Sequence, residues 1–341
     1  MRVGIDIRKL LDYGIGTYIR GLIAGLTECR GDEEYVLFGS EDARPAVLPE
    51  GFSFHAVEAP HYSIRELFLM GRAVKRARID VFHAPHYVVP FTSCPTVVTI
   101  HDLIHLRMRH RNPLAPVYAR AMLRRAVRKS RRVITVSETV KRDIEAVFPG
   151  ARVSVTPNGV GDAFRPLRRP MAGPSYFLFV GNDKPHKNVE RAVEEFVMLR
   201  KERPKTSLLL VGAPFERFHG TEGVIAPGYL SGDELASLYR HAIALVLPSR
   251  EEGFGLPALE AMASGIGVIT SKHPALMEVT GDAALHVDVE SPGAMAAAMR
   301  ELIDDPARRD TLAQRGIERA KEFTWRRCAE LTRRIYMDAR A

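Results

Sequence analysis

The chain alternates short strand-like runs with amphipathic helical stretches along most of its length. In the first half, the β-branched or aromatic runs are RVGIDI at 2–7, YVLFG at 35–39, TVVTI at 96–100 and RVITV at 132–136. Alternation of this kind is typical of parallel βαβ architecture. The sequence therefore predicts an α/β fold built on doubly wound parallel sheets.

A second alternating series follows a break in this pattern. At residues 161–174, GDAFRPLRRPMAGP, prolines, glycines and arginines interrupt any periodicity, so we interpret this segment as a linker. The strand-like runs beyond it are YFLFV at 176–180, SLLLV at 207–211, IALVLP at 243–248 and GVIT at 267–270. Helices are predicted from about Asn188, at 232–241, from Pro257, and from Trp325 to about Ala339.

The length of the chain supports a division into two Rossmann-like domains. Its 341 residues exceed what one core usually organises, and 46% apolar residues can fill two cores. We expect an N-terminal domain at 1–165, a C-terminal domain at 166–322 and a final helix at 323–341. Two such sheets bring the carboxyl ends of their strands to a shared crevice, which is where these folds bind ligands.

Cysteine content and hydropathy indicate a protein of a reducing compartment. Cys29, Cys94 and Cys328 are odd in number and widely spaced, which argues against a disulfide framework. The chain opens on a strand-like run that lacks the pattern of a secretory signal. It also lacks the run of about 18 apolar residues that a membrane-spanning helix needs. We expect a cytoplasmic protein, either soluble or peripheral on the inner face of the cell membrane.

Positive charge is concentrated in one segment of a chain whose formal net charge is +8. The segment 107–132 contains no acidic residue, and its basic residues are Arg107, Arg109, Arg111, Arg120, Arg124, Arg125, Arg128, Lys129, Arg131 and Arg132. Such clustering indicates an anionic partner. The candidates are nucleic acid, an anionic membrane and a phosphorylated substrate.

Part of this basic segment has helical periodicity. Arg120, Arg124 and Arg128 recur on a side distinct from an apolar stripe of Ala119, Met122, Leu123, Ala126 and Val127. A solvated helix packed on the sheet explains the stripe but not the excess of arginine. Association with an anionic membrane surface, or attraction of a lipid-phosphate acceptor, fits slightly better, because it gives the arginines a partner. Nucleic acid fits less well, because aromatic interleaving and a known binding module are missing.

The most informative segment is SREEGFGLPALEAMASG at 249–265, which follows the buried-strand run IALVLP. Proline suits the first turn of a helix, so Pro257 predicts a helix start. The turn at 253–255 then presents unpaired N–H groups and a positive helix dipole at the carboxyl edge of the sheet. We expect a phosphate group there, flanked by the carboxylates of Glu252 and Glu260.

This segment closely resembles the signature of the family 4 retaining glycosyltransferases, which have the GT-B fold. The resemblance covers most of the chain through GIGTYIRGL at 14–22, NGV at 158–160, VGNDKPHKN at 180–188 and GYL at 228–230. It implies that Glu252 acts in catalysis by binding donor-sugar hydroxyls, that Glu260 binds the ribose, and that the last helix crosses back onto the N-terminal domain. The other donor-binding positions that it implies are Gly253, Phe254, Gly255, Leu256, Gly16, Gly212, Tyr229 and Leu230.

The run VGNDKPHKN also leads from a strand into a helix and so brings amides near an anion. A diphosphate leaving group needs its charge neutralised, by a divalent metal or by fixed cations. We find no clear DxD-type acidic pair at a strand end, so we predict protein cations, with no metal and no other cofactor. Lys187 matches the family's phosphate-binding lysine, whereas Asn182 replaces the companion arginine of many members. Lys184 and His186 are candidates for the second cation, and a solvent-facing Lys184 is the alternative.

The glycines at the start of GIGTYI come close to the dinucleotide-binding fingerprint. Ile19 replaces the third glycine of that fingerprint, and the preceding strand ends several residues earlier, which disfavours NAD. The glycosyltransferase resemblance uses the same loop differently. In it, Gly14 on the acceptor side and Gly16 near the donor let the backbone approach the phosphate and the transfer site.

His101 and Asp102 follow the run TVVTI and are expected at the carboxyl edge of the first sheet. The resemblance assigns His101 to the donor-sugar pocket as a catalytic residue, and we place Asp102 on the acceptor side. With His83, His86 and His105, His101 also suggests zinc. No cysteine joins the set, so we do not predict a zinc site, and we expect His83 to be structural.

Together these features predict a retaining, metal-independent glycosyltransferase. It would move a hexose from a nucleotide-diphosphate sugar in the C-terminal domain to a hydroxyl of a glycan or lipid-linked acceptor in the N-terminal domain. The GNxxPHKN variant resembles bacterial enzymes that use GDP-mannose, in polysaccharide or glycolipid synthesis. The alternatives are a nucleotide-sugar epimerase or phosphorylase on the same fold, and a nucleic-acid-binding protein, which the basic charge alone suggests.

Overall fold

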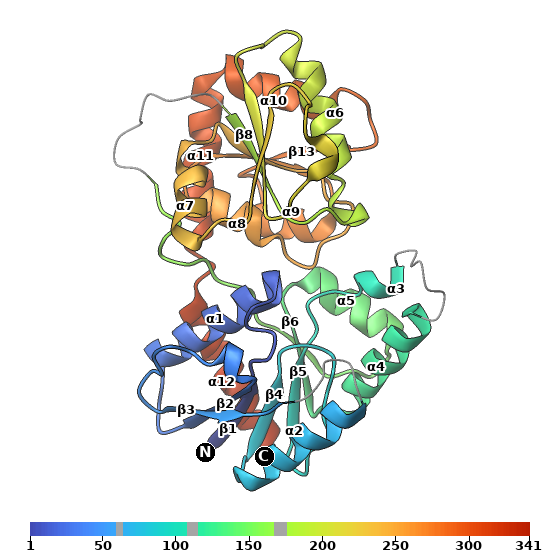
Figure 1. Cartoon of the computed structure of the whole chain (residues 1–341), viewed down its shortest axis with the longest axis vertical. Helices are drawn as coiled ribbons and strands as arrows, with labels where there is room; N and C mark the ends of the chain where they lie inside the picture. Colours follow the sequence, from blue (N-terminus) through green and yellow to red (C-terminus); the bar gives the residue numbers. More distant parts are fainter. Residues whose placement is uncertain (59–63, 108–114, 167–175) are drawn as a thin grey trace. The chain divides into compact units, whose positions relative to one another are not determined.

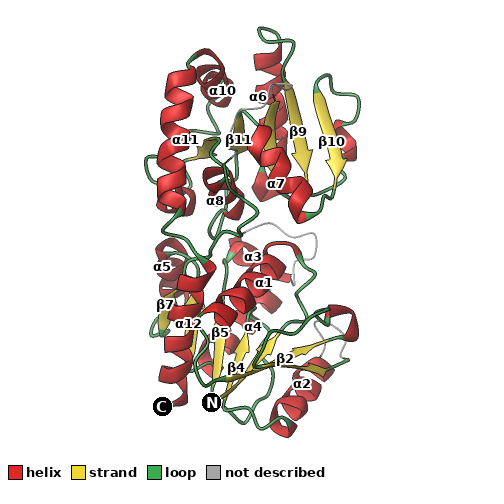
Figure 2. Cartoon of the chain, turned by 90° about the vertical axis from the view of Figure 1, so that its left-hand side faces the viewer, coloured by secondary structure: helices red, strands yellow, loops and turns green. Residues whose placement is uncertain are grey.

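The structure is a computed structural model (Figure 1 and Figure 2) that describes residues 1–58, 64–107, 115–166 and 176–341. These residues form two compact units, one of Met1–Gly159 with Thr324–Ala341 and one of Val160–Phe323. The chain thus changes unit after Gly159 and after Phe323, where the sequence predicted changes after 165 and 322. Much of the predicted linker lies outside the described residues.

The first unit is built on a seven-stranded parallel sheet in the order β3-β2-β1-β4-β5-β6-β7. Its strands are β1 Arg2–Asp6, β2 Glu34–Gly39, β3 Phe52–Ala56, β4 Val81–Ala84, β5 Thr96–Thr99, β6 Arg132–Thr135 and β7 Val153–Val155. The sequence predicted β1, β2, β5 and β6 to within one residue at each end. It missed β3, β4 and β7, because these short segments mix polar with apolar residues and do not stand out from their surroundings.

Helices pack against this sheet and close its core. They are α1 Tyr13–Glu28, α2 Ile64–Arg76, α3 Ile104–Arg107, α4 Ala115–Lys129, α5 Glu138–Val147 and α12 Trp325–Arg340, with a 3-10 turn η1 at Glu41–Ala43. Met70 of α2, Leu123 of α4 and Ile144 of α5 meet Phe82 and Val98 of the strands in one buried cluster. Removal of this apolar surface from water is the main contribution to the stability of the unit.

The last helix of the chain belongs to the first unit. α12, red in Figure 1, packs on α1, and the Trp325 ring occupies the space where a Cβ of Gly21 would stand. Gly25, one turn further along α1, likewise lies against the backbone of Trp325. Since only glycine allows so close an approach at these two positions, the contact is built into the sequence. The prediction that the final helix crosses back to the N-terminal domain is confirmed.

The second unit contains a six-stranded parallel sheet in the order β10-β9-β8-β11-β12-β13. Its strands are β8 Tyr176–Val180, β9 Ser207–Val211, β10 Val224–Gly228, β11 Ala244–Leu247, β12 Gly267–Ser271 and β13 Leu285–Val287. Its helices are η2 Pro185–Lys187, α6 Val189–Arg200, η3 Glu216–Phe218, α7 Gly232–His241, α8 Leu256–Ala263, α9 Pro274–Thr280, α10 Ala294–Asp304 and α11 Pro306–Ala320. The four predicted strands are present, and β10 and β13 are additional.

Local signals explain where the elements of the second unit begin. α7 starts at a capping box, in which Ser231 accepts from the amide of Glu234 and the Glu234 side chain bonds back to Ser231.

The core of the second unit joins Phe177 and Phe179 of β8 to Phe196 of α6. The strand order turns outward from β8 in one direction and β11 in the other, which is the arrangement of a doubly wound sheet.

α4 is amphipathic, as the sequence predicted. Leu123 is buried, and Arg120, Arg124 and Arg128 are exposed. Arg109 and Arg111 of the basic segment lie outside the described residues. In the part of the chain that the structure describes, none of the helices combines the length and the apolar character that crossing a membrane requires.

Candidate active site

A glycine turn leads from β11 into α8 at the carboxyl edge of the second sheet. Gly255 has a φ of +96°, and a Cβ at this position would lie 2.5 Å from Cδ2 of Leu276. Both facts require glycine there. α8 starts at Leu256, and Pro257, which has no N–H to leave unpaired, is its second residue. The Phe254 ring is buried and packs edge-on against Phe323. The part of the turn that lies at the start of α8 is therefore its backbone.

Glu252, just before this turn, forms an ion pair with Lys187. Nζ of Lys187 lies 2.6 Å from Oε1 of Glu252, and the two side chains are 15% and 8% exposed. The two residues are 65 positions apart, and their predicted roles were separate, with no indication of the pair. Their proximity places a fixed cation and a carboxylate side by side at the end of β8 and β11.

Two hydrogen bonds hold these two loops together. Nδ2 of Asn188 donates to the carbonyl of Pro248 at 3.2 Å, and the amide of Arg250 donates to the carbonyl of His186 at 2.8 Å. Asn188 has a φ of +53°, which reverses the chain between η2 and α6. Asparagine tolerates this conformation better than most residues. Asn188 is therefore a site-building residue that the sequence reasoning missed, although its place before a helix was a visible signal.

Glu260 lies one turn into α8 and bonds to a buried tyrosine. The hydroxyl of Tyr239 in α7 donates to Oε2 of Glu260 at 2.9 Å. Burial raises the pKa of Glu260 to about 7, although the bond from Tyr239 acts in the opposite direction. The Tyr239 ring is fully buried and packs edge-on against Phe164. The sequence reasoning missed Tyr239, because the apolar pattern of α7 accounts for a core tyrosine without a polar role.

The candidates for the second cation differ in their surroundings. Lys184 is exposed and His186 is buried. The Asn182 side chain accepts from the amide of Lys184 at 3.3 Å and so shapes the loop. The neighbouring Asp183 pairs with Arg217 of η3, a further cation beside this loop that the sequence reasoning did not identify.

The other donor-binding candidates of the second unit lie at the ends of β9 and β10. Gly212 follows β9, and its amide bonds to the carbonyl of Gly228 at 3.1 Å. Tyr229 is 74% exposed, whereas Leu230 is half-buried. Gly253 occupies the turn between Glu252 and Phe254. All of these positions belong to the carboxyl side of the second sheet.

In the first unit, Gly14 and Gly16 lie within a helix. α1 starts at Tyr13, so Gly14 and Gly16 lie in its first turn and not in the loop to which the sequence analysis assigned them. The reason is tertiary, because a Cβ at Gly16 would collide with the carbonyl of Leu10 in the preceding loop. Gly16 lets that loop fold back onto the helix.

His101 and Asp102 follow β5, as predicted, and both make local bonds. Nε2 of His101 donates to the carbonyl of Pro85 at 3.0 Å, and its ring packs edge-on against Tyr18. Burial lowers the pKa of His101, so the ring is neutral and Nδ1 carries its lone pair. Oδ1 of Asp102 accepts from the amide of Ile104 at 3.0 Å and so caps α3.

The carboxyl edge of the first sheet also holds a buried ionic cluster that the sequence reasoning missed. Asp6, at the end of β1, is fully buried and receives Nε and Nη2 of Arg8 at 2.9 and 2.6 Å. Nε2 of His86 lies 3.3 Å from the same carboxylate. Although burial opposes ionisation, Arg8 and His86 hold the pKa of Asp6 far below its usual range.

His83 is structural, as predicted. Its Nδ1 lies 2.7 Å from the hydroxyl of Tyr336 in α12, and its Nε2 lies 2.8 Å from that of Thr99. Burial lowers the pKa of His83 to about 3, so it stays neutral at physiological pH. Across the described ranges, no three His, Cys, Asp or Glu side chains gather as metal ligands.

The chain contains two units with doubly wound parallel sheets. In the second unit, a lysine–glutamate pair lies beside a glycine turn and the start of a helix. This is the architecture of the GT-B class. Residues 13–164 match the family described as Glycosyltransferase Family 4, and residues 165–320 match Glycosyl transferases group 1. The chain belongs to glycosyltransferase family 4, and it is a glycosyltransferase with the GT-B fold.

Individual relatives agree with this assignment. The chain is 28% identical over 280 residues to O-antigen chain mannosyltransferase B of Escherichia coli, covering 75% of this chain and 74% of the relative. It is 32% identical over 293 residues to glycogen synthase of Mycobacterium tuberculosis, covering 77% and 70%. Among solved structures, sucrose-phosphate synthase from Thermosynechococcus elongatus superposes with a TM-score of 0.82 at 20% identity, covering 99% and 98%.

Proposed function

We propose that this glycosyltransferase moves a hexose from a nucleotide-diphosphate sugar bound by the second unit, with retention of anomeric configuration and without a metal. The observation that carries the proposal is the Lys187–Glu252 pair at the carboxyl edge of the sheet, beside the turn into α8. The pair offers a cation for a diphosphate and a carboxylate for sugar hydroxyls within one small region.

Charge and hydrogen bonding suggest a division of roles. The ammonium group of Lys187 is placed to neutralise charge that develops on the leaving diphosphate. Glu252 uses Oε1 for Lys187, which leaves Oε2 for a hydroxyl of the sugar. Glu260 similarly uses Oε2 for Tyr239 and keeps Oε1 for a ribose hydroxyl. The amides of Gly255 and Leu256 would approach the diphosphate, because the start of α8 favours an anion.

For the chemical step we propose that the leaving phosphate itself helps to remove the proton of the acceptor hydroxyl on the same face of the sugar. No enzymic nucleophile is then needed. The neutral His101 of the first unit would contact the donor sugar, with Gly14 and Asp102 on the acceptor side. Product analysis with a supplied acceptor distinguishes transfer from epimerisation, which leaves the sugar on the nucleotide, and from phosphorolysis, which releases a sugar phosphate.

The donor that we propose is GDP-mannose. The sequence variant GNDKPHKN and the similarity to an O-antigen mannosyltransferase support mannose, whereas the similarity to glycogen synthase makes a glucose donor the natural comparison. Thermal unfolding with GDP-mannose, UDP-glucose and ADP-glucose tests this. A donor that binds only the folded protein raises the melting temperature, by the equivalent of about 2.7 kcal/mol at a hundred times its Kd. A larger shift with a glucose donor would contradict the mannose assignment.

The acceptor that we propose is a glycan or lipid-linked hydroxyl in bacterial polysaccharide or glycolipid synthesis, and the protein would be peripheral on the inner face of the cell membrane. The exposed arginines of α4 support association with an anionic surface, because each basic residue near such a surface contributes about 1 kcal/mol. Replacing Arg120, Arg124 and Arg128 together by Gln should weaken binding to anionic liposomes and leave transfer to a water-soluble acceptor near normal. An equal loss with soluble and lipid-linked acceptors would instead assign these arginines to the acceptor site.

A further inference from the structure

A groove of about 620 Å³ lies between the C-terminal half of α4 and the turn that joins α5 to β7. Arg131 precedes β6, and Arg152 precedes β7, so the groove opens at the amino-terminal edge of the first sheet. His101 and Asp102 follow β5 at the opposite, carboxyl edge. The groove is therefore separate from the residues proposed for transfer in this unit.

Arginine dominates the lining of this groove, which we call the arginine groove. Its basic residues are Arg120, Arg124, Arg128, Arg131 and Arg152. It is lined by no acidic residue, and the sequence contains none between Asp102 and Glu138. Among the described residues, none forms an ion pair or side-chain hydrogen bond with these five guanidinium groups. Five like charges around one space repel one another and destabilise the compact state.

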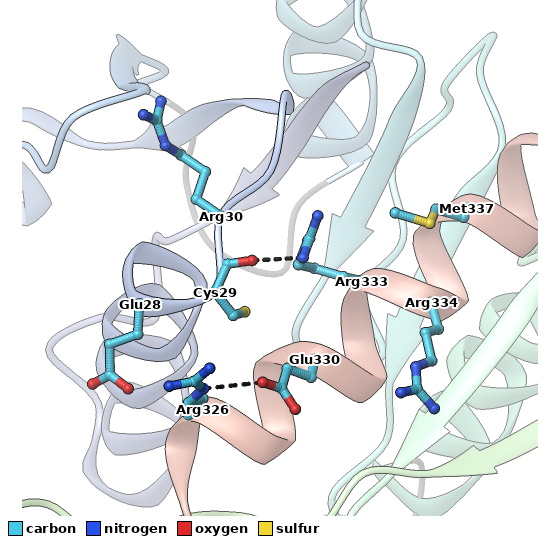
Figure 3. Close-up of a pocket in the computed structure, with 8 residues that line it drawn as sticks. All are labelled: Glu28, Cys29, Arg30, Arg326, Glu330, Arg333, Arg334 and Met337. Atoms are coloured by element: carbon cyan, nitrogen blue, oxygen red, sulfur yellow. Dashed lines mark hydrogen bonds and ion pairs between the residues drawn. The ribbon is translucent and has the colours of Figure 1, made fainter.

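Several other arginines of the first unit are bonded within the protein. Arg125, also on α4, donates to the carbonyl of Val89 and lies over the ring of Phe91 at 4.4 Å. A second cavity (Figure 3) has a volume of about 440 Å³, and its arginines are Arg30, which follows α1, and Arg326, Arg333 and Arg334 of α12. There Arg326 bonds to Glu330 at 3.0 Å, and Arg333 bonds to Glu33 at 2.7 Å and to the carbonyl of Cys29. Arg326 and Arg333 are thus neutralised within the protein, whereas the five guanidinium groups of the arginine groove remain available to an external anion.

The shape and walls of the groove indicate what kind of anion. Guanidinium groups match phosphate oxygens with paired N–H donors, and several from different elements can surround one phosphate. Val127, Val147, Phe148 and Pro149 add apolar walls, which strengthen charge interactions by excluding water. The ligand class is therefore a phosphate-bearing group with an apolar portion.

The exposed surface of α4 indicates where that phosphate is found. Val117 and Tyr118, near the start of the helix, are 65% and 46% exposed. Val117 shares a helix side with Arg124 and Arg128, because seven and eleven residues span about two and three turns. An exposed apolar side chain beside basic residues can enter the headgroup region of a membrane while the basic residues contact anionic lipid.

We propose that the arginine groove is a binding site for the headgroup phosphate of an anionic phospholipid. The site comprises both α4 and the α5–β7 turn, so Arg131 and Arg152 contribute to it although neither lies on the basic helix. This inference deepens the proposed association with the membrane and rests on it. It predicts that lipid binding depends on the position of the charges and not only on their number.

The test compares two variants that lose the same charge. Arg131→Gln with Arg152→Gln removes two exposed arginines of the groove. The matched control, Lys75→Gln with Arg76→Gln, removes two exposed charges from α2, outside the groove. We expect the groove variant to bind phosphatidylglycerol vesicles at least about tenfold more weakly than the parent, and the control to stay within about threefold. Phosphatidylcholine vesicles should bind neither variant nor the parent appreciably.

Further arms identify the source of the phosphate and keep the result interpretable. Equal losses in both variants, or no loss in the groove variant, would overturn the site. Stabilisation of the parent by inorganic pyrophosphate without binding to phosphatidylglycerol vesicles would overturn the lipid assignment. If the groove variant loses its circular dichroism signal, the single change Arg124→Gln replaces it, and normal vesicle binding by that variant would count against the site. Thermal stabilisation by a nucleotide sugar should persist in every folded variant, so its failure in the parent would count against the proposed function alone.

Discussion

At the carboxyl edge of the first sheet, Asp6 and His83 are completely buried and bonded to Arg8, Thr99 and Tyr336 of the same unit. At the corresponding edge of the second sheet, the partly exposed Lys187 forms an ion pair with the buried Glu252, beside the glycine turn into α8. The two sheets share parallel, doubly wound topology. Their edges differ in how completely the polar side chains are buried and bonded within their own unit.

This difference teaches that sheet topology places polar residues at an edge without deciding what they do. In the first unit, α12 returns to supply Tyr336 to His83, and the cluster around Asp6 is sealed from water. In the second unit, two hydrogen bonds join the loops after β8 and β11, and Lys187 keeps part of its side chain exposed beside Glu252. We therefore expect substitutions at the first edge to change stability and substitutions at the second to change function.

The largest expected effect is at the carboxyl edge of the first sheet, where the polar groups are buried. Asp6→Asn should lower the free energy of unfolding by about 3–5 kcal/mol, because it leaves the buried Arg8 without its counter-charge. Urea denaturation of the two proteins measures this loss. Asp12→Asn, which breaks the exposed pair with Lys9, is the control and should cost less than about 1 kcal/mol. Similar costs for both variants would remove the contrast between the edges.

The next effect concerns the second sheet. It tests whether Glu260 contributes to stability, as the buried residues at the edge of the first sheet do. Its folded-state pKa of about 7 exceeds the ordinary 4.5, so the folded protein binds more protons than the unfolded chain between these values. Stability should therefore fall as pH rises from 4.5 to 7, by about 2–3 kcal/mol, and change little from this source above that. Urea denaturation at pH 5 and pH 8 should show this fall in the parent and a smaller one in Glu260→Gln. The same pH dependence in both proteins would show that Glu260 does not titrate as described.

At the carboxyl edge of the second sheet, Lys187→Ala should reduce the rate of transfer about a hundredfold, as expected when one electrostatic contact to the transition state is lost. The free energy of unfolding should change far less than in Asp6→Asn, because Lys187 is partly exposed. Steady-state kinetics and urea denaturation of the same variant measure both. Lys201→Ala, an exposed lysine of the same unit, is the control. A large loss of stability with normal transfer would make the pair structural.

The two glutamates should separate transfer from nucleotide binding. Glu252→Gln should slow transfer by about tenfold or more while the affinity for free nucleotide stays near normal, since we assign it to sugar hydroxyls. Glu260→Ala should weaken binding of the free nucleotide as well, about tenfold if one hydrogen bond to a charged group is lost. Calorimetric titration with nucleotide, beside kinetics, gives both values. Near-normal results for both variants would argue against the site.

The smallest expected effect is that of a chelator. If Lys187 neutralises the leaving diphosphate, excess EDTA should leave the rate of transfer unchanged within about twofold. The control is a glycosyltransferase known to need manganese, assayed in the same buffer. Loss of activity with EDTA and its recovery with magnesium or manganese would replace the protein cation with a metal at the second edge.

Much of the fold could be predicted from local sequence patterns. Strands β8 and β9 are continuous apolar runs bounded by polar residues, and the predicted bounds agree with the observed ones. The start of α8 could be predicted because Gly255 and Pro257 each have a strong local preference. β10 and β13 could not, since β10 contains Pro227 and β13 has only three residues. For such segments the neighbouring strand, rather than the local sequence, favours the extended conformation.

The candidate site was predicted as a set of positions but not as a set of contacts. Glu252 and Glu260 were identified from their places around a turn and a helix start and from the resemblance to the family, and Lys187 was identified from that resemblance. Their partners were not, because the pair Lys187–Glu252 spans 65 residues and Tyr239 reaches Glu260 from another helix. Gly16 was identified but misplaced, since its role depends on the Leu10 carbonyl that packs above it.

The sequence by itself determined the parallel α/β class, the division into two units, the helix start at the glycine turn and the family of the protein. The first three depend on periodicity and on glycine and proline, whose preferences act over a few residues, and the family depends on the resemblance of several short motifs. Only the tertiary structure decided that Asp6 and His83 would be sealed, that Lys187 would meet Glu252, and that Arg131 and Arg152 would line one groove with α4. Burial and charge pairing depend on distances between segments far apart in the chain, and packing sets those distances.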